Sequence, residues 1–144
     1  MNQHAVVNKF SHVKPGDTEF GGGGLRDFFR YRDLGIASAT GGQVICQLVK
    51  ANPEMPPEDG TGWHKHECDF QIVIMMKGWA RFMYQDTPTL VQAGDVVHQR
   101  PGIVHYLYDD SPDMEYLEIV SPADFKTVDM PPAVDNVPPV TPWK

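Results

Sequence analysis

The chain consists of short apolar segments that alternate with runs of Gly, Pro, Asp and Asn. Six segments of five to eight residues are rich in Val, Ile and aromatic residues, which is typical of β-strands. They cover residues 44–51, 70–77, 80–85, 95–99, 104–108 and 115–120. No segment shows the sustained 3.6-residue period of a long amphipathic helix. The pattern therefore predicts an all-β domain, a sandwich or barrel with antiparallel pairing.

The two ends of the chain differ from this body. The first part has no regular period and closes with four consecutive glycines, Gly21 to Gly24, which predict a flexible lead-in. Residues 25–35 mix aromatic residues and arginines and fit either a short strand or a single helical turn. The last fifteen residues contain five prolines, which favour an extended arm. This arm lies along its own barrel or a partner's, with Trp143 as an anchor, or it is a solvated terminus. The predicted organisation is a lead-in, a barrel and an arm, at residues 1–24, 25–128 and 129–144.

Length and charge limit the kinds of partner. A chain of 144 residues suits one domain, and its formal net charge of −7 argues against sequence-independent binding to nucleic acid or an anionic membrane. No leader-like or membrane-spanning apolar run is present, so a cytoplasmic protein is expected. Cys46 and Cys68 lack CxxC spacing and are expected to be reduced thiols, with Cys68 a minor candidate for a metal ligand. A small molecule is the expected partner.

The stretch GWHKHECDFQIVIMMKG, residues 62–78, places two histidines just before a strand. Alternate residues of a strand point the same way, so His64 and His66 can reach one point in space. Gln71 has the opposite parity, so a turn or bulge at residues 67–69 must reset the register. With that reset, positions 71, 73 and 75 point into the barrel and positions 70, 72, 74 and 76 point outward. The outward positions are also apolar, so neither face is expected to see water, and we expect this second face to pack on another sheet or subunit in a homodimer.

Two motifs, in this order, resemble the two motifs of the cupin family. The first is matched by His64, His66, Gln71 and Gly78, with glutamine where most members have glutamate. The second is matched by Gly94, Gly102 and His105, with Arg100 at the usual proline and Asp109 at the usual asparagine. The resemblance covers residues 60–109, about a third of the chain. It implies a double-stranded β-helix, the small jelly-roll barrel, with one divalent metal held by His64, His66, Gln71 and His105.

Glutamine at position 71 bears on the chemistry that the resemblance implies. Its amide offers a neutral carbonyl oxygen and cannot act as a base. Three imidazoles and an amide leave the metal charge uncancelled, so the centre is expected to attract an anionic or enolisable oxygen donor. Iron, manganese, zinc and nickel all suit imidazole, so the metal is not identified. The hypothesis is an enzyme acting on a small oxygenated molecule, as a dioxygenase or by non-redox isomerase or lyase chemistry; the alternative is a non-catalytic ligand-binding or sensing protein.

Two further residues are candidates for proton transfer. His98 is either a general base near the metal or a hydrogen-bonded structural histidine. Glu118 lies in an apolar strand, would need a partner if it pointed inward, and would then replace the base that a glutamine ligand cannot supply. Arg81 and Lys50 either bind a substrate carboxylate or are solvent-facing charges, and the second reading is favoured. The tyrosines at 106, 108 and 116 are expected mainly in the core or an interface.

Overall fold

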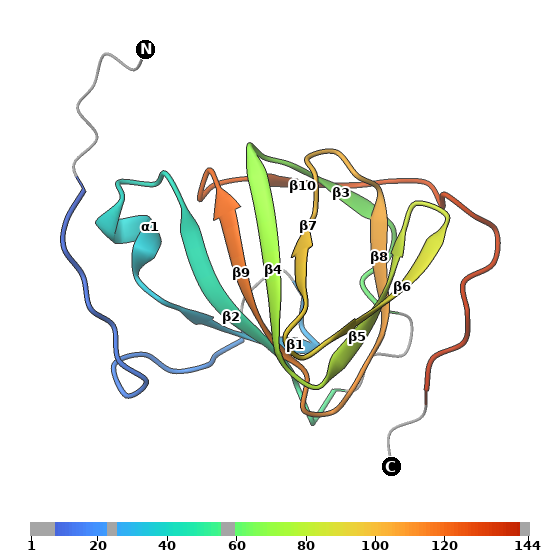
Figure 1. Ribbon diagram of the computed structural model, residues 1–144, viewed down its shortest axis with the longest axis horizontal. Helices are drawn as coiled ribbons and strands as arrows, with labels where there is room; N and C mark the ends of the chain where they lie inside the picture. The colour runs from blue at the N-terminus through green and yellow to red at the C-terminus, as the bar shows by residue number, and fades with distance from the viewer. Residues whose placement is uncertain (1–7, 23–25, 56–59, 142–144) are drawn as a thin grey trace.

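The computed structural model describes residues 8–22, 26–55 and 60–141, which contain ten strands and one short helix (Figure 1). Gly23, Gly24 and Trp143, which featured in the predictions above, lie outside the described residues. The elements are β1 (Phe29–Asp33), α1 (Ile36–Ala39), β2 (Ile45–Ala51), β3 (His64–Glu67), β4 (Phe70–Lys77), β5 (Trp79–Tyr84), β6 (Thr87–Gln92), β7 (Val96–His98), β8 (His105–Asp110), β9 (Glu115–Ser121) and β10 (Lys126–Asp129). No helix in this part of the chain is long and apolar enough to cross a membrane.

The strands form two antiparallel five-stranded sheets. One has the order β1-β2-β9-β4-β7 and the other the order β10-β3-β8-β5-β6, so the chain crosses repeatedly from one sheet to the other. Figure 1 shows the sheets as two facing layers that lie closest at the lower edge of the view. The prediction of an all-β jelly-roll barrel is confirmed.

The apolar pattern located the central strands better than the edge strands. Each of the six predicted segments is a strand with nearly the predicted ends, and the ambiguous segment 25–35 contains the strand β1. The pattern missed β6 and β10, which are the two outer strands of the second sheet. An edge strand tolerates polar residues and even a proline such as Pro88, because its outer side makes no ladder.

The strand β4 has the register that the parity of Gln71 required. The chain bends at Cys68 and Asp69, between the end of β3 in one sheet and the start of β4 in the other. Gln71, Val73 and Met75 are consequently buried between the sheets, as predicted. On the outer face of β4, Met76 is 50% exposed in the single chain, so the expectation that a second subunit covers this face stays a prediction.

The apolar core fills the space between the sheets. Its largest cluster combines residues of both sheets: Phe29, Val49, Ala51, Met75, Ala80, Phe82, Val91, Leu107 and Met114. Complete burial of one large apolar side chain is worth roughly 1.5–3 kcal/mol, so the cluster holds the two sheets at a fixed separation. The remaining space between the sheets forms the site described below.

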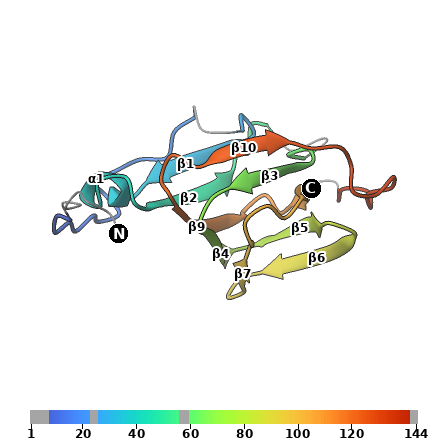
Figure 2. The ribbon, with the colours of Figure 1, turned by 90° about the horizontal axis from the view of Figure 1, so that it is seen from above.

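The segment before β1 packs on the barrel, at the end of the molecule where α1 lies (Figure 2). The Lys9 backbone N–H donates to the Ala39 carbonyl at 2.8 Å, and Gly21 pairs with Tyr31 of β1. The described part of the lead-in is therefore attached to the first sheet by backbone hydrogen bonds.

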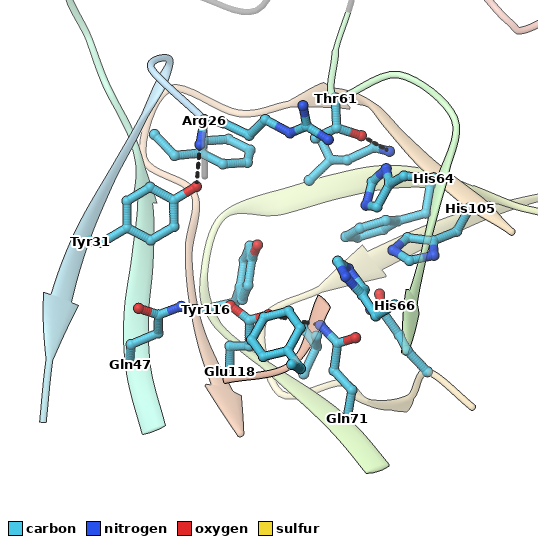
Figure 3. Close-up of a pocket in the computed structure, with 16 residues that line it drawn as sticks. Arg26, Tyr31, Gln47, Thr61, His64, His66, Gln71, His105, Tyr116 and Glu118 are labelled. Atoms are coloured by element: carbon cyan, nitrogen blue, oxygen red, sulfur yellow. Dashed lines mark hydrogen bonds between the residues drawn. The ribbon is translucent and has the colours of Figure 1, made fainter. Parts of the chain in front are cut away.

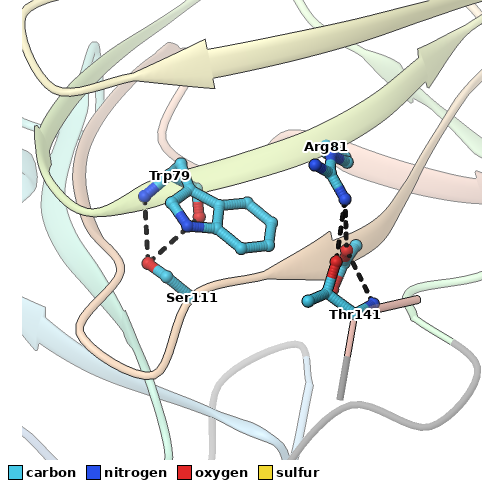
Figure 4. Close-up of polar contacts among 5 residues, drawn as sticks. Trp79, Arg81, Ser111 and Thr141 are labelled. Carbon is cyan, nitrogen blue, oxygen red and sulfur yellow. Dashed lines mark hydrogen bonds and ion pairs between the residues drawn. The ribbon is translucent and has the colours of Figure 1, made fainter. Parts of the chain in front are cut away.

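The described part of the proline-rich arm lies along its own barrel, at the opposite end in Figure 2. Val134 and Val137 pack against a cluster on the outer side of β3, β5 and β8 that includes Trp63. Farther along, the Thr141 hydroxyl accepts a hydrogen bond from Arg81 at 2.8 Å, and its backbone N–H donates to Asp109 at 2.9 Å (Figure 4). Of the alternatives left open by the sequence, packing on the chain's own barrel is the one observed.

Candidate metal centre

Three histidines converge between the two sheets. His64 and His105 lie directly opposite each other on β3 and β8, and His66 follows on the same face of β3. All three are buried, and their rings lie 4.3–5.0 Å apart between centroids. One ring nitrogen of each lies within 4.8 Å of the others. The structure thus brings together the three histidines that the motifs single out.

Backbone hydrogen bonds fix the orientation of two of these rings. The Nδ1 atom of His64 lies 2.7 Å from the Gly62 carbonyl, and that of His105 lies 2.9 Å from the Ile103 carbonyl. A carbonyl only accepts, so Nδ1 carries the proton and Nε2 of the neutral ring keeps its lone pair. Gly62 has a φ of +76°, a conformation that favours glycine and turns its carbonyl toward His64.

The third ring is held by a side chain. Nδ1 of His66 lies 2.8 Å from the hydroxyl oxygen of Thr127, which is its direct partner in the pairing of β10 with β3. A hydroxyl can accept a hydrogen bond from Nδ1–H, and in that tautomer Nε2 of His66 is again left with its lone pair. Such a hydrogen bond behind the ring is the usual way in which a protein orients a metal-binding histidine.

Burial keeps these imidazoles neutral. It lowers the pKa of His66 to about 3, with the neighbouring His105 and His64 adding to the effect, and it lowers the pKa of His105 to about 4. The pKa of His64 is also lowered, chiefly by burial. Neutral imidazole is the form that binds metals, so the three rings fit a divalent transition metal such as iron, manganese, zinc or nickel.

Gln71 is hydrogen-bonded to a buried carboxylate. Its amide nitrogen donates to Oε1 of Glu118 at 2.7 Å, while Gln47 donates to Oε2 at 3.1 Å. Because a carboxylate accepts, the amide NH₂ of Gln71 must face Glu118, which leaves its carbonyl oxygen on the side of His66 (Figure 3). Glu118 therefore orients Gln71 as an oxygen donor toward the histidine cluster.

The position of Glu118 follows from the strand register. Glu118 is paired with Gln47 on β2 and with Val73 on β4, so Gln71 is its diagonal neighbour. Burial raises the pKa of Glu118, and the hydrogen bonds from Gln47 and Gln71 offset part of that rise. Glu118 is the one carboxylate among the described residues that line the pocket. Glu118 thus points into the pocket and has the partners that an inward carboxylate needs, while its catalytic role stays a prediction.

The histidines open onto a pocket with a volume of about 230 Å³. It has room for about eight water molecules at roughly 30 Å³ each, so the ligand is a small molecule. Its walls are mainly apolar and aromatic: Phe29, Tyr31, Val73, Phe82, Leu107, Tyr116 and Phe125. A few polar groups complete the lining: Arg26, Gln47, Thr61, Gln71, Gln99 and Glu118.

His98, which the sequence offered as a candidate base, does not line the pocket. His98 is paired with Ile72 of β4, so its side chain lies on the outer face of the sheet, where it is exposed. The next residue, Gln99, is buried and lines the pocket in its place. The sequence pattern placed the right strand near the site but could not tell which of two neighbouring side chains turned inward.

Other candidate residues also lie away from the pocket. Arg81 forms an ion pair with Asp109 at 3.1 Å, and the ammonium group of Lys50 lies 4.2 Å from the ring centroid of Phe20. Both agree with the favoured reading of surface charges. Cys68 is a free, half-buried thiol outside the histidine cluster.

Sequence reasoning missed several residues of the site. Thr127 lies in the unpredicted edge strand β10, and Arg26 lies in the segment that the apolar pattern left ambiguous. Gln47 and Tyr116 belong to predicted strands, but their inward orientation follows from the pairing of β2 with β9, which the sequence did not fix.

Comparisons with known proteins agree with this geometry. Residues 54–126, which include all four residues of the predicted metal site, match the model of a family described as the AraC-like ligand binding domain. An oxalate-binding protein of Thermotoga maritima is 30% identical to the chain over 71 residues. That match covers 49% of this chain and 59% of the relative, so the chain spans less than two thirds of the relative's length.

Solved structures share the fold at low sequence identity. KdgF from Halomonas sp. superposes with a TM-score of 0.62 at 17% identity, over 78% of this chain and 94% of that one. The polyketide cyclase RemF from Streptomyces resistomycificus superposes with a TM-score of 0.65 at 14% identity, over 83% and 84% of the two chains. At such identities the likeness concerns the fold.

Proposed function

The chain belongs to the AraC-like ligand binding domain family and is a cupin, and from that premise we propose that it is a metal-dependent enzyme acting on a small oxygenated anion. The observation that supports this most directly is the set of three buried, neutral imidazoles that converge on one point, two of which have Nε2 left unprotonated because Nδ1 donates to a backbone carbonyl. His64, His66 and His105 would hold the metal, with the carbonyl oxygen of Gln71 as the fourth protein donor.

Within this proposal, non-redox proton transfer fits the pocket best. A bound divalent metal would supply Lewis acidity toward an oxygen donor of the substrate. Glu118 is a buried carboxylate beside that centre, and it would accept a proton from the carbon next to the polarised group and return it to another atom of the same molecule. Gln47 and Gln71 hold both of its oxygens in place by donating to them. This is isomerase chemistry; in a lyase reaction, the bond from the adjacent carbon to a leaving group would break and Glu118 would give the proton to that departing group. Neither reaction requires an oxidant.

A second candidate function is ligand binding without catalysis. It is supported by the family's description as a ligand-binding domain and by the relative described as an oxalate-binding protein. In that case the same residues bind a small carboxylate, and Glu118 serves only to orient Gln71.

Deuterium exchange separates the candidates. The metal-loaded protein is incubated in D₂O with enolisable small acids such as pyruvate and malonate, and exchange next to the carbonyl is followed by NMR while oxygen uptake is recorded. Non-redox chemistry predicts exchange without oxygen uptake, reduced about 100-fold or more in Glu118→Gln. Oxygen uptake would identify a dioxygenase, and binding without either signal would identify the non-catalytic protein.

We also propose a homodimer that uses the outer face of the first sheet. On this face, Met76 of β4 is 50% exposed and Val96 of β7 is 65% exposed. The other outward residues of β4, at positions 70, 72 and 74, are also apolar. Light scattering after gel filtration tests this directly: a mass near 32 kDa, twice the 16.1 kDa of the chain, is expected, and a mass of one chain contradicts it. A cytoplasmic location remains an expectation.

A further inference from the structure

The pocket contains one cationic side chain, Arg26, which none of the site motifs includes. Among the described residues that line the pocket, no other is an arginine or a lysine. Figure 3 shows its side chain reaching across the pocket from the side of β1 toward Thr61 and His64.

The backbone around Arg26 is anchored, so its side chain has a defined starting point. The Arg26 backbone N–H donates to the hydroxyl oxygen of Tyr31 at 3.0 Å (Figure 3). The carbonyl of Arg26 accepts from the backbone N–H of Phe29 at 3.3 Å. Both contacts tie Arg26 to β1, whose residues Phe29 and Tyr31 also line the pocket.

Within the described chain, part of the Arg26 guanidinium lacks a hydrogen-bond partner. Its Nε is buried and has no hydrogen-bond partner among the described residues. The ion pairs that arginines form among the described residues are those of Arg30 with Glu54 and of Arg81 with Asp109. Glu118, the carboxylate in the same pocket, accepts from Gln47 and Gln71 instead. Arg26 is half-buried as a whole, and a buried guanidinium nitrogen without a hydrogen-bond partner is unfavourable, so the arrangement favours an anion supplied from outside.

We propose that Arg26 is the specificity-determining residue of the pocket and that it selects ligands carrying a planar carboxylate. This rests on the proposed function, because the same pocket holds the candidate metal centre. A guanidinium matches a carboxylate with two parallel N–H···O bonds, which a neutral ligand cannot form equally well. A phosphate dianion fits less well, because it offers more charge and more acceptor oxygens than one guanidinium satisfies. The apolar walls would contact the uncharged remainder of the ligand.

Binding of matched ligand pairs tests the assignment. Calorimetric titrations use the full chain with acetate, pyruvate and benzoate, with the corresponding neutral amides, and with inorganic phosphate. The variants are Arg26→Gln, Arg26→Lys and the control Arg30→Gln. Arg30 lies on β1, close to Arg26 in the chain, but does not line the pocket. Each titration is run on metal-loaded and on chelator-treated protein, with the metal content of every sample measured.

We expect at least one carboxylate to bind more tightly than its amide. Arg26→Gln weakens that carboxylate about tenfold or more, as expected for hydrogen bonds to a charged group, while Arg26→Lys has a smaller effect and Arg30→Gln has none. The inference is overturned if no carboxylate binds, if amide or phosphate binds as well as carboxylate, or if Arg26→Gln leaves the preference unchanged at full metal content. A wild-type protein that takes up no metal but keeps the Arg26-dependent preference would instead contradict the proposed function alone.

Discussion

Acid should destabilise the metal-free protein through its buried histidines. A histidine whose pKa is lowered by folding contributes stability above the unfolded value of 6.5, and that contribution is lost as pH falls toward the folded value. The window runs from 6.5 down to about 3 for His66 and to about 4 for His105. Between about pH 7.5 and about pH 5, each of these two residues should therefore cost about 2 kcal/mol of unfolding free energy.

The assay is urea unfolding of untagged, chelator-treated protein at both pH values. His66→Gln should lose about 2 kcal/mol less than the wild type on acidification, because the substituted side chain does not titrate. His98→Gln is the matched control, since His98 is an exposed histidine outside the cluster. The raised pKa of Glu118 acts in the opposite direction, with stability lost as pH rises above 4.5, and it cancels when wild type and variant are compared. Equal acid sensitivity in wild type and His66→Gln would refute the reasoning.

Three further predictions concern the surroundings of the site. Thr127→Val removes the hydroxyl behind His66, and metal affinity measured by chelator competition should fall about 10–100-fold while Thr127→Ser retains it; equal affinities would contradict the orienting role. Gln71→Glu places a second carboxylate where the Gln71 amide now lies 2.7 Å from Glu118. Calorimetry of the metal-free variant should therefore show a melting temperature lowered by several degrees, and an unchanged melting temperature would argue against that contact. Val134→Asp introduces a charge where the arm meets the barrel and should lower the unfolding free energy by about 1–3 kcal/mol; a change within about 0.5 kcal/mol would indicate that the arm is not packed there in solution.

The sequence predicted the fold and the histidine cluster because both depend on local patterns. Alternation of apolar residues identifies strands, and the spacing of His64 and His66 on one strand fixes their common direction. The parity of Gln71 even required the bend between β3 and β4 that the structure contains. The jelly-roll barrel and the place of His105 in the cluster, by contrast, were implied by the resemblance of the two motifs to the cupin family.

The rest of the site depends on pairing between distant strands. Thr127 reaches His66 because β10 pairs with β3, and Gln47 reaches Glu118 because β2 pairs with β9. His98 and Gln99 show the limit most clearly, since a difference of one position decides which side chain faces the pocket. The register of pairing between distant strands cannot be read from a single sequence.

Elemental analysis of protein purified without a metal-affinity step tests the metal centre most directly. Wild-type protein, His64→Ala and the control His98→Ala are compared after gel filtration, with the fold of each checked by circular dichroism. We predict about one transition-metal ion per chain in the wild type and in His98→Ala, and its loss from a folded His64→Ala. Wild-type protein that neither contains a metal nor takes one up from excess iron, manganese, zinc or nickel, or a His64→Ala variant that keeps the full complement, would contradict a metal site built on these three histidines.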